Sequence, residues 1–245
     1  MKALILAAGY ATRLYPLTRN FPKPLLVVNK KPIINYIVDK LSRIEECDEI
    51  FVITNNKFFP HFKKWAKTIK SPKKISVIND KTLSLKDRRG AIGDMYYAII
   101  KMKINNDLLV IGGDNLFNKD LSGFVRFVLS KKRHPCIGAF DIMDKKIARN
   151  YGVIKIDASK KIINFQEKPK APASTIVAMC LYYFPASKLD LVGEYLSSRS
   201  HKNDATGFYI DWLRKVEAVY GYVFGGRWFD IGNKEFYKEA SNTFK

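Results

Sequence analysis

The chain has few cysteines and no long hydrophobic segment. Its 245 residues include three cysteines, Cys47, Cys136 and Cys180, which lie far apart and without C-x-x-C spacing. Neither a disulfide framework nor a structural zinc site is therefore indicated. No apolar run approaches the roughly 18 to 20 residues of a membrane-spanning helix, and the amino-terminal run meets Gly9 and Arg13 before it reaches the length of a secretory signal. We expect a folded, soluble protein of the reducing cytoplasm, without a membrane partner.

Acidic residues are outnumbered by basic ones. The chain has 43 Lys and Arg residues against 23 Asp and Glu residues, and so a formal net charge of +20. Such an excess suits an anionic partner, which could be a nucleic acid, an anionic membrane face or a phosphorylated small molecule. The lysines are scattered in short clusters such as Lys30–Lys31 and Lys63–Lys64, so most of them are expected on the solvated surface. The charge points to anions without identifying one.

Apolar runs alternate with segments of helical period along the first half, the pattern of βαβ units around a largely parallel sheet. The strands predicted there are Ala3–Leu6, Ile50–Ile53, Ile75–Ile78, Leu108–Ile111 and Cys136–Phe140, and the helices are Ile33–Glu45, Phe58–Ile69, Asp94–Lys103 and Leu121–Lys132. The second half is richer in strands: a hairpin of Tyr151–Ile156 and Lys161–Phe165, strands Thr175–Phe184 and Tyr220–Phe224, and helices Lys188–Ser198, Gly207–Val216 and Asn233–Asn242. We find no repeat or long linker, which favours one α/β domain.

The first predicted strand ends in LAAGYATRLYPLTRNFPKPLL. A strand that runs into a glycine-containing loop at the carboxyl edge of a parallel sheet is typical of phosphate binding. Two familiar phosphate-binding motifs are excluded. A dinucleotide fingerprint G-x-G-x-x-G would need glycine at positions 11 and 14, and a Walker A loop would need lysine at position 15; none of these residues is present. Gly9, Thr12, Arg13 and Lys23 remain, and these two cations suit a triphosphate that becomes pyrophosphate. On spacing alone, a plain strand-to-helix turn is an equal alternative.

The fourth predicted strand ends in LLVIGGDNLF, so Asp114 emerges at its carboxyl end. A carboxylate there can meet a ligand-borne Mg²⁺, which takes one or two protein carboxylates and completes its octahedron with water and phosphate oxygens. Asp230 in GGRWFDIGN is a candidate for the second carboxylate, and Asp204 and Asp211 compete with it. As bare residues, these aspartates are more often turn formers or helix caps.

The segment NYGVIKIDASKKIINFQEKP places Glu167 and Lys168 directly after a predicted strand. Carboxylates commonly hold sugar hydroxyls, and a lysine suits a phosphate. An exposed surface ion pair is the alternative, and without further information it is the better one.

Taken in order, these segments resemble the sugar-1-phosphate nucleotidyltransferase family, also called nucleoside diphosphate sugar pyrophosphorylases, and especially the catalytic domains of glucose-1-phosphate thymidylyltransferases and uridylyltransferases. The resemblance rests on LAAGYATRLYPLT with PKPLL, GAIGD, GGDN, YGV followed by EKP, and WFDIG, which span residues 2 to about 240. It implies the Rossmann-like nucleotide-diphospho-sugar transferase fold, a mixed, mostly parallel sheet flanked by helices. It also implies a nucleotide-binding half, residues 1–140, and a sugar-phosphate-binding half, residues 141–245.

The resemblance implies that sugar 1-phosphate and nucleoside triphosphate give nucleoside diphosphate sugar and pyrophosphate, with Mg²⁺ as cofactor. Its implied catalytic residues are Arg13, Lys23 and Asp114, and its metal ligands are Asp114 and Asp230. The implied nucleotide-binding residues are Ala8, Gly9, Thr12, Arg13, Asn79 and Gly90, and the sugar-phosphate side would use Lys23, Gly152, Glu167 and Lys168. The nucleophile is a phosphate oxygen that is already ionised near pH 7, so no Ser, Cys or His nucleophile is needed.

Several residues depart from the family pattern. Ala11 stands at the loop's second glycine, Met179 and Cys180 replace a threonine and a glycine, and Asn79 is shorter than the glutamine at the pyrimidine edge. UTP or dTTP with glucose 1-phosphate is favoured, but base and sugar stay open. The chain ends soon after Asp230, so no appended β-helix or acyltransferase domain is expected. The alternatives are a phosphocholine cytidylyltransferase, a non-catalytic nucleotide-sugar-binding protein and, for the charge, a nucleic-acid binder, which the motifs disfavour. A homo-oligomer is left open.

Overall fold

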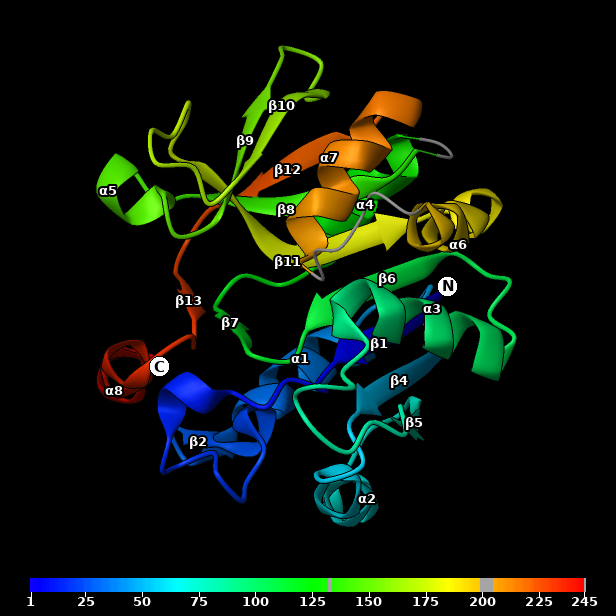
Figure 1. The fold of residues 1–245 in the computed structure, drawn as a ribbon, viewed down its shortest axis with the longest axis vertical. Coiled ribbons are helices and arrows are strands. Elements are labelled where there is room, and N and C mark those ends of the chain that lie inside the picture. The colour runs from blue at the N-terminus through cyan, green and yellow to red at the C-terminus, as the bar shows by residue number, and fades with distance from the viewer. Residues whose placement is uncertain (132–133, 199–204, 245) are drawn as a thin grey trace.

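The chain folds around one mixed sheet. The computed structural model describes residues 1–131, 134–198 and 205–244, and within them the main sheet has nine strands (Figure 1). They are β1 (Lys2–Leu6), β4 (Glu49–Thr54), β5 (Lys74–Asn79), β6 (Leu108–Gly112), β8 (Cys136–Asp141), β9 (Gly152–Ile156), β10 (Ile162–Glu167), β11 (Ile176–Phe184) and β12 (Tyr220–Phe224). The order β10-β9-β11-β6-β1-β4-β5 forms the main path, and β8 pairs with both β11 and β12.

The two halves of the chain build different parts of this sheet. Strand β1 lies parallel between β4 and β6, and β5 extends the parallel part beyond β4. The later strand β11 joins antiparallel to β6 and also pairs antiparallel with β8 and β9. The predicted Rossmann-like α/β fold, with a mixed sheet and a second half richer in strands, is confirmed. The carboxyl ends of β1 and β6 therefore meet at one edge of the sheet.

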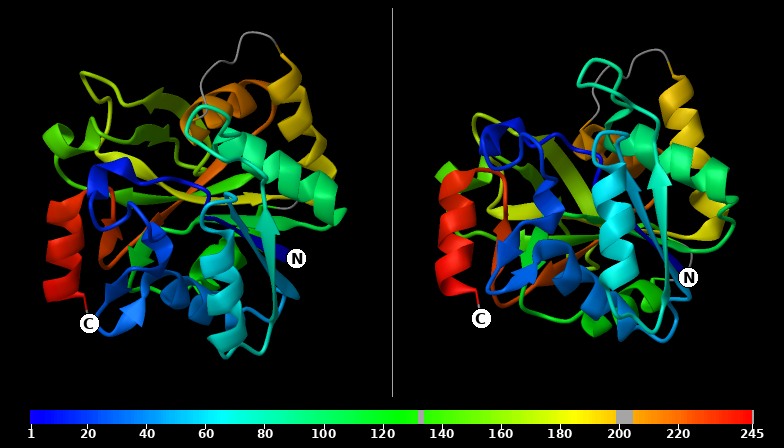
Figure 2. Two further views of the ribbon diagram at one scale, coloured as in Figure 1. Left: turned by 60° about the horizontal axis from the view of Figure 1, so that its bottom comes forward. Right: turned by 90° about the horizontal axis from the view of Figure 1, so that it is seen from below.

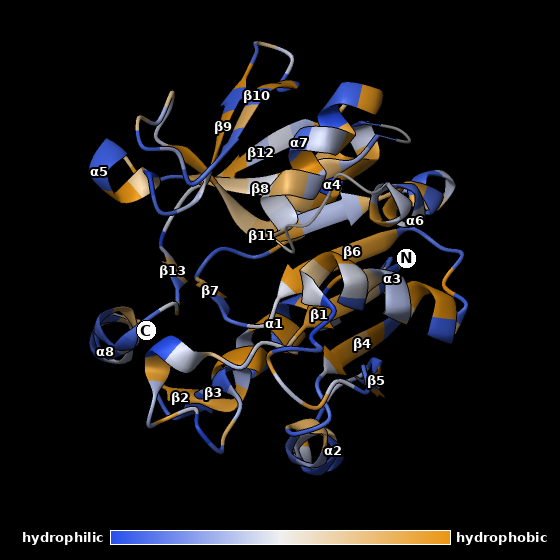
Figure 3. Ribbon diagram, viewed as in Figure 1, coloured by the Kyte–Doolittle hydropathy of each residue, from blue (hydrophilic) through white to orange (hydrophobic). Residues whose placement is uncertain are grey.

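Helices cover both faces of the sheet (Figure 2). They are α1 (Ile33–Ser42), α2 (Phe59–Thr68), α3 (Gly90–Met102), α4 (Ser122–Ser130), α5 (Lys145–Ala148), α6 (Asp190–Ser197), α7 (Thr206–Val216) and α8 (Lys234–Thr243). Side chains of α1, α2 and α4 form one core with Ala3 and Ile5 of β1, whereas α3, α6 and α7 form the other with Leu4. This alternation follows from the two-residue period of a strand. Figure 3 shows hydrophobic residues concentrated on β1, β4 and β6.

Three short features differ from the sequence-based expectations. Helix α3 begins at Gly90 rather than at the predicted Asp94, although a glycine such as Gly93 inside a helix costs about 1 kcal/mol relative to alanine. Helix α5 was not predicted, because a single turn shows no hydrophobic period. Helix α4 ends at Ser130, and the predicted end at Lys132 lies outside the described residues. Within the described parts of the chain, no helix is both long and apolar enough to cross a bilayer.

Two small ribbons were also not predicted. Strand β7 (Asn115–Phe117) pairs antiparallel with β13 (Trp228–Asp230), and β2 (Val27–Val28) pairs with β3 (Lys31–Pro32). Strands of two or three residues are too short to show a readable alternation. Helix α8 packs beside β2, where the Tyr237 hydroxyl donates a hydrogen bond of 2.9 Å to the carbonyl of Val27 (Figure 2). The carboxyl-terminal segment is thereby brought next to the amino-terminal loops.

A buried pair of carboxyl groups lies beside the edge strand β5. Asp80 follows β5 and Asp94 lies on α3, and both residues are buried. Burial, and next the negative charge of Asp80, raise the pKa of Asp94 to about 8. One oxygen of Asp94, Oδ1, has no hydrogen-bond partner. Asp94 therefore carries a proton at neutral pH.

We expect Asp94→Asn to stabilise the fold increasingly as the pH rises. The folded protein keeps the Asp94 proton up to about pH 8, whereas the unfolded chain releases it near pH 4. Asp94 therefore disfavours the folded state progressively through this window, and a neutral amide does not. The midpoint of thermal unfolding should rise by at least about 2 °C at pH 9 and by less at pH 5.

Asp120 provides a control of opposite sign, since hydrogen bonds from Ser122 lower its pKa. Asp120→Asn should lower the unfolding midpoint at pH 9. If Asp94→Asn raised the unfolding midpoint equally at both pH values, Asp94 would not be protonated in the folded protein.

Candidate active site

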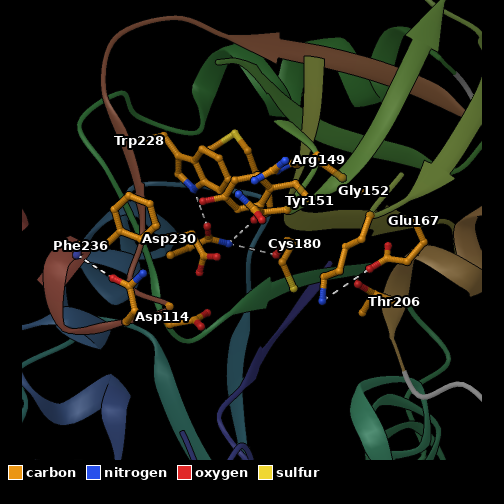
Figure 4. Close-up of a pocket in the computed structure, with 18 of the residues that line it drawn as sticks. Asp114, Arg149, Tyr151, Gly152, Glu167, Cys180, Thr206, Trp228, Asp230 and Phe236 are labelled. Atoms are coloured by element: carbon orange, nitrogen blue, oxygen red, sulfur yellow. Dashed lines mark hydrogen bonds and ion pairs between the residues drawn. The ribbon is translucent and has the colours of Figure 1, made fainter. Parts of the chain in front are cut away.

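A cavity of about 620 Å³ lies at the sheet edge where β1 and β6 end (Figure 4). Its walls come from both halves of the chain. Of the residues predicted to bind ligands, those that line it are Arg13, Asp114, Gly152, Glu167, Lys168 and Asp230. The other predicted residues lie outside its lining, and they are Ala8, Gly9, Thr12, Lys23, Asn79 and Gly90. The tertiary structure thus brings the metal-binding and sugar-phosphate candidates to one cavity.

Two aspartates from distant segments face this cavity. Asp114 follows β6, and the pairing of β13 with β7 sets Asp230 opposite Asn115, the neighbour of Asp114. The turn before Asp114 needs glycine at position 113, because a Cβ there would lie 2.9 Å from the carbonyl oxygen of Leu6. This close approach lets the Gly113 amide donate to the same oxygen at 2.8 Å. The backbone of β6 is therefore tied to β1 where Asp114 emerges.

The environment of the two aspartates favours a cation. Burial, and next the charge of Asp114, raise the pKa of Asp230 to about 6. Three cations, Lys23, Arg13 and Lys168, act in the opposite direction on that pKa. The Lys23 ammonium forms an ion pair with Asp114, although Lys23 does not itself line the cavity. A bound divalent cation would relieve the repulsion between the two carboxylates.

The donor set fits a magnesium ion whose coordination shell is completed by water or by phosphate oxygens. No group of three or more His, Cys, Asp or Glu side chains within the described residues could hold a metal by itself. Mg²⁺ is usually bound through one or two carboxylates and completes its shell with water and phosphate oxygens. Asp114 and Asp230 supply two carboxylates, so the remaining positions suit a phosphorylated ligand. Asp211 instead pairs with Arg214 and Lys215, and Asp204 lies outside the described residues.

The loop after β1 presents Arg13 to the cavity. Thr12–Leu14 form a single 3₁₀ turn, and Ala11 precedes it with a φ of 48° and a ψ of 45°. This left-handed conformation is the one that glycine adopts most readily, so the alanine is accommodated at some cost. The buried Thr18 hydroxyl donates to the carbonyl of Ala11 at 2.7 Å and so closes the loop. Arg13 is exposed and is free to meet an anion.

The opposite wall carries Glu167 and Lys168, at the end of β10. Burial raises the pKa of the Glu167 carboxyl, and the charge of Lys168 lowers it. The Lys168 Nζ atom lies 3.9 Å from Glu167 Oε1 (Figure 4). The Lys168 amide donates to the carbonyl of Tyr151 at 3.0 Å. Two adjacent residues thus offer a carboxylate and an ammonium to the same cavity.

Helix α7 fits against Glu167 because its second residue is a glycine, Gly207. A Cβ atom on Gly207 would lie 1.8 Å from Glu167 Oε2, which no conformation of the surroundings could accept without moving the carboxylate. The neighbouring Thr206 hydroxyl accepts a hydrogen bond of 2.8 Å from Tyr182. Gly207 was not predicted as a site residue, because nothing in the sequence indicates which distant side chain fills the space beside it.

Two of the predicted nucleotide-binding residues, Ala8 and Asn79, are held by hydrogen bonds to neighbouring residues. Asn55 donates to the carbonyl of Ala8 at 2.8 Å. The Asn79 amide donates to Asn56 at 2.8 Å, and its oxygen accepts from the Lys81 backbone at 2.8 Å. Asn79 is therefore held within the protein at both ends of its amide. The roles of these residues in binding a base stay predictions.

Several lining residues were not predicted as ligand contacts. They include Asn115, Arg149, Tyr151, Thr206, Trp228 and Phe236. Asn115 and Trp228 belong to the motifs GGDN and WFDIG. Their closeness in sequence to Asp114 and Asp230 could have indicated that they lie at the site. Cys180 also lines the cavity, with a φ of 51° at an irregularity in β11. This left-handed backbone is the one that glycine adopts most readily, in keeping with the expectation that the family pattern has a glycine here.

Cations, paired carboxylates and a glycine-bearing loop at the carboxyl edge of a mixed sheet are typical of α/β proteins that bind phosphorylated ligands. The profile of the nucleotidyl transferase family matches residues 2–245. The chain belongs to this family, and the predicted resemblance is confirmed.

Curated proteins of similar sequence include named nucleotidyltransferases. The chain is 30% identical over 234 residues to the bifunctional protein GlmU of Methanocaldococcus jannaschii. The aligned region covers 95% of this chain and 51% of that protein. It is 29% identical over 241 residues to a protein of Sulfolobus acidocaldarius named as a putative mannose-1-phosphate guanyltransferase, with 95% and 60% covered. The chain thus spans about half the length of the GlmU relatives.

Solved structures share the fold. A putative glucose-1-phosphate thymidylyltransferase from Bacillus anthracis superposes with a TM-score of 0.83 at 22% identity, covering 99% of this chain and 94% of that one. A UDP-glucose pyrophosphorylase complexed with UDP-glucose gives a TM-score of 0.82 at 21% identity, covering 99% and 97%. At this identity the likeness concerns the arrangement of the chain.

Replacing Asp230 by asparagine should stabilise the protein when no metal is present. Above pH 6 the ionised, half-buried Asp230 lies beside Asp114, so the neutral amide removes a repulsion. The midpoint of thermal unfolding at pH 8 in EDTA should rise by about 2 °C. Mn²⁺ should raise the midpoint of the wild type and leave that of Asp230→Asn unchanged.

Asp211→Asn is the matched control, since Asp211 is paired with Arg214 and Lys215 outside the cavity. Its response to Mn²⁺ should equal that of the wild type. An Asp230→Asn protein that Mn²⁺ still stabilises would remove Asp230 from the metal site.

Proposed function

We propose that the protein transfers a nucleotidyl group from a nucleoside triphosphate to a sugar 1-phosphate, and releases nucleoside diphosphate sugar and pyrophosphate. The observation that carries this proposal is the cavity in which Asp114 and Asp230 lie between two sets of cations. Arg13 and Lys23 come from the loop after β1, and Lys168 comes from the opposite wall. Family membership supports the same reaction.

The reaction requires two anions to approach each other. A phosphate monoester has a second pKa near 6, so the attacking oxygen of the sugar phosphate is ionised at pH 7 and needs no general base. Lys168 would hold this phosphate in line with the α-phosphorus of the triphosphate, and Arg13 and Lys23 would stabilise the leaving pyrophosphate. Glu167 would accept hydrogen bonds from sugar hydroxyls, with the Gly152 backbone alongside.

Asp114 and Asp230 would hold Mg²⁺, which when bound neutralises the charge that develops on the phosphate oxygens. The raised pKa of Asp230, caused first by burial and next by the charge of Asp114, supports this role, because a bound cation would offset both effects. Residues 1–140 would then form the nucleotide-binding half and residues 141–245 the sugar-phosphate-binding half. The substrates would be small molecules, and nucleic acid would not be a partner.

The resemblance narrows the choice of nucleoside triphosphate and sugar 1-phosphate. We favour UTP or dTTP with glucose 1-phosphate, as the motifs suggest, and the names of the structural neighbours support this choice. The Sulfolobus relative, named for mannose 1-phosphate and a guanylyl group, makes GTP with mannose 1-phosphate a second pair to examine. Phosphocholine with CTP remains the pair that would indicate a cytidylyltransferase.

Pyrophosphate release across a matrix of triphosphates and phosphorylated substrates tests the proposal. We expect release with a sugar 1-phosphate in the presence of Mg²⁺, and a loss of at least about 100-fold in kcat for Asp114→Asn. Preference for phosphocholine with CTP over every sugar phosphate would replace the substrate assignment. No release with any pair would leave a non-catalytic nucleotide-sugar-binding protein as the better description.

Gly207→Ala should weaken the use of sugar phosphate selectively. The new Cβ would displace the Glu167 carboxylate, from which it would lie 1.8 Å away. We expect the KM for sugar 1-phosphate to rise about tenfold while the KM for triphosphate changes little, because a lost polar contact to substrate costs on this order.

Gly225→Ala is the matched control, because a Cβ at Gly225 would meet nothing within 4 Å. It should leave both KM values unchanged. If folded Gly207→Ala kept the wild-type KM for sugar 1-phosphate, Glu167 would not contact the sugar.

A further inference from the structure

The Asn115 side chain joins three strands at the base of the cavity. Its Oδ1 atom accepts a hydrogen bond of 2.7 Å from the Trp228 indole of β13, and its Nδ2 atom donates to the carbonyls of Met179 and Cys180 in β11, the latter at 3.1 Å. An indole N–H can only donate and a carbonyl can only accept, so the orientation of the Asn115 amide is determined. Only 3% of Asn115 is exposed. No water can therefore replace these contacts easily.

The Trp228 ring is packed on its other sides by aromatic residues. Its centroid lies 5.8 Å from that of Phe140 and 5.4 Å from that of Tyr151. Tyr151 in turn accepts the backbone hydrogen bond of Lys168. Figure 4 shows Trp228 and Asp230 on the same short segment, with the indole directed toward the bonded amide. The Trp228 ring is therefore held by one hydrogen bond to Asn115 and by ring contacts with Phe140 and Tyr151.

The position of Asp230 depends on this contact. Strands β7 and β13 have three residues each, and Asp230 pairs with Asn115 at the end of the ribbon. An isolated two-stranded ribbon is at best marginally stable, so its backbone bonds alone do not determine where Asp230 lies. The bond between Trp228 and Asn115 crosses the same ribbon, and the bonds that Asn115 donates to Met179 and Cys180 tie it to β11.

We propose that Asn115 and Trp228 are positioning residues that hold Asp230 beside Asp114 and so form the divalent-cation site. This assignment rests on the proposed function for the identity of the site. Neither side chain touches the cation or the reacting phosphates in this role. They act by limiting how far β13 can move from β7, as residues behind metal ligands commonly do.

A purely structural role makes a different prediction, and the chain contains a control for it. Trp65 of α2 donates its indole N–H to Asn35 Oδ1 at 2.8 Å, the same chemistry as the bond between Trp228 and Asn115. Neither Trp65 nor Asn35 lines the cavity. Trp65→Phe and Trp228→Phe each keep an aromatic ring and remove one buried donor, so losses that reflect stability alone should be similar in the two variants.

Mn²⁺ binding to the nucleotide-free protein, measured by the loss of the free-ion paramagnetic resonance signal, tests the proposal. We expect Trp228→Phe to raise the dissociation constant for Mn²⁺ about tenfold or more and Trp65→Phe to leave it unchanged. The Mg²⁺ concentration for half-maximal pyrophosphate release should rise in parallel for Trp228→Phe.

Asn115→Ala tests whether the two residues act as one unit. In combination with Trp228→Phe, its effect on the Mn²⁺ dissociation constant should be smaller than the product of the single effects. Multiplicative effects on the Mn²⁺ dissociation constant would overturn the assignment. It would also be overturned if Trp228→Phe bound Mn²⁺ like the wild type, or if Trp65→Phe weakened Mn²⁺ binding as much as Trp228→Phe does. Wild-type protein without saturable Mn²⁺ binding would also overturn it. Mn²⁺ binding without pyrophosphate release from any substrate pair would instead refute the proposed function alone.

Discussion

The repulsion between two carboxylates is the constraint around which the cavity is organised. Asp114 and Asp230 come from segments more than a hundred residues apart, and burial, and next the charge of Asp114, raise the pKa of Asp230 to about 6. Such a pair costs folding free energy, so the surrounding structure must hold it in place. The close approach of Gly113 to Leu6 fixes one carboxylate, and the short β7–β13 ribbon fixes the other. A destabilising pair kept in a cavity is typical of a binding site.

The positive charge of the chain is used selectively. Of the many basic side chains, Lys23, Arg13 and Lys168 are those that lower the pKa of Asp230. Their field suits a triphosphate and a sugar phosphate on opposite sides of a metal ion. Other lysines, such as Lys63 and Lys64 on α2, are exposed away from the cavity lining. The net charge of +20 therefore describes the whole surface, whereas the proposed recognition of phosphates would depend on a few cations at one sheet edge.

The fold was largely predictable because its main elements carry strong local signals. Strand β1 alternates between two cores, and α1 buries residues such as Ile33, Ile37 and Leu41 on one side, so both patterns are visible in the sequence. Weak local signals explain the errors. The start of α3 was placed late because glycine disfavours a helix interior, and β7 and β13 are stabilised by partners distant in sequence.

By itself, the sequence determined the class of fold and the motifs at the sheet edge, because periodicity and short motifs are properties of neighbouring residues. It could not choose among Asp204, Asp211 and Asp230 from residue type alone, and only the resemblance favoured Asp230. The tertiary structure set Asp230 beside Asp114 and showed Asp211 in a separate ion pair. It also brought together Gly207 with Glu167 and Trp228 with Asn115. Such contacts are decided only when the whole sheet is assembled, because they depend on the geometry of strands and helices far apart in the chain.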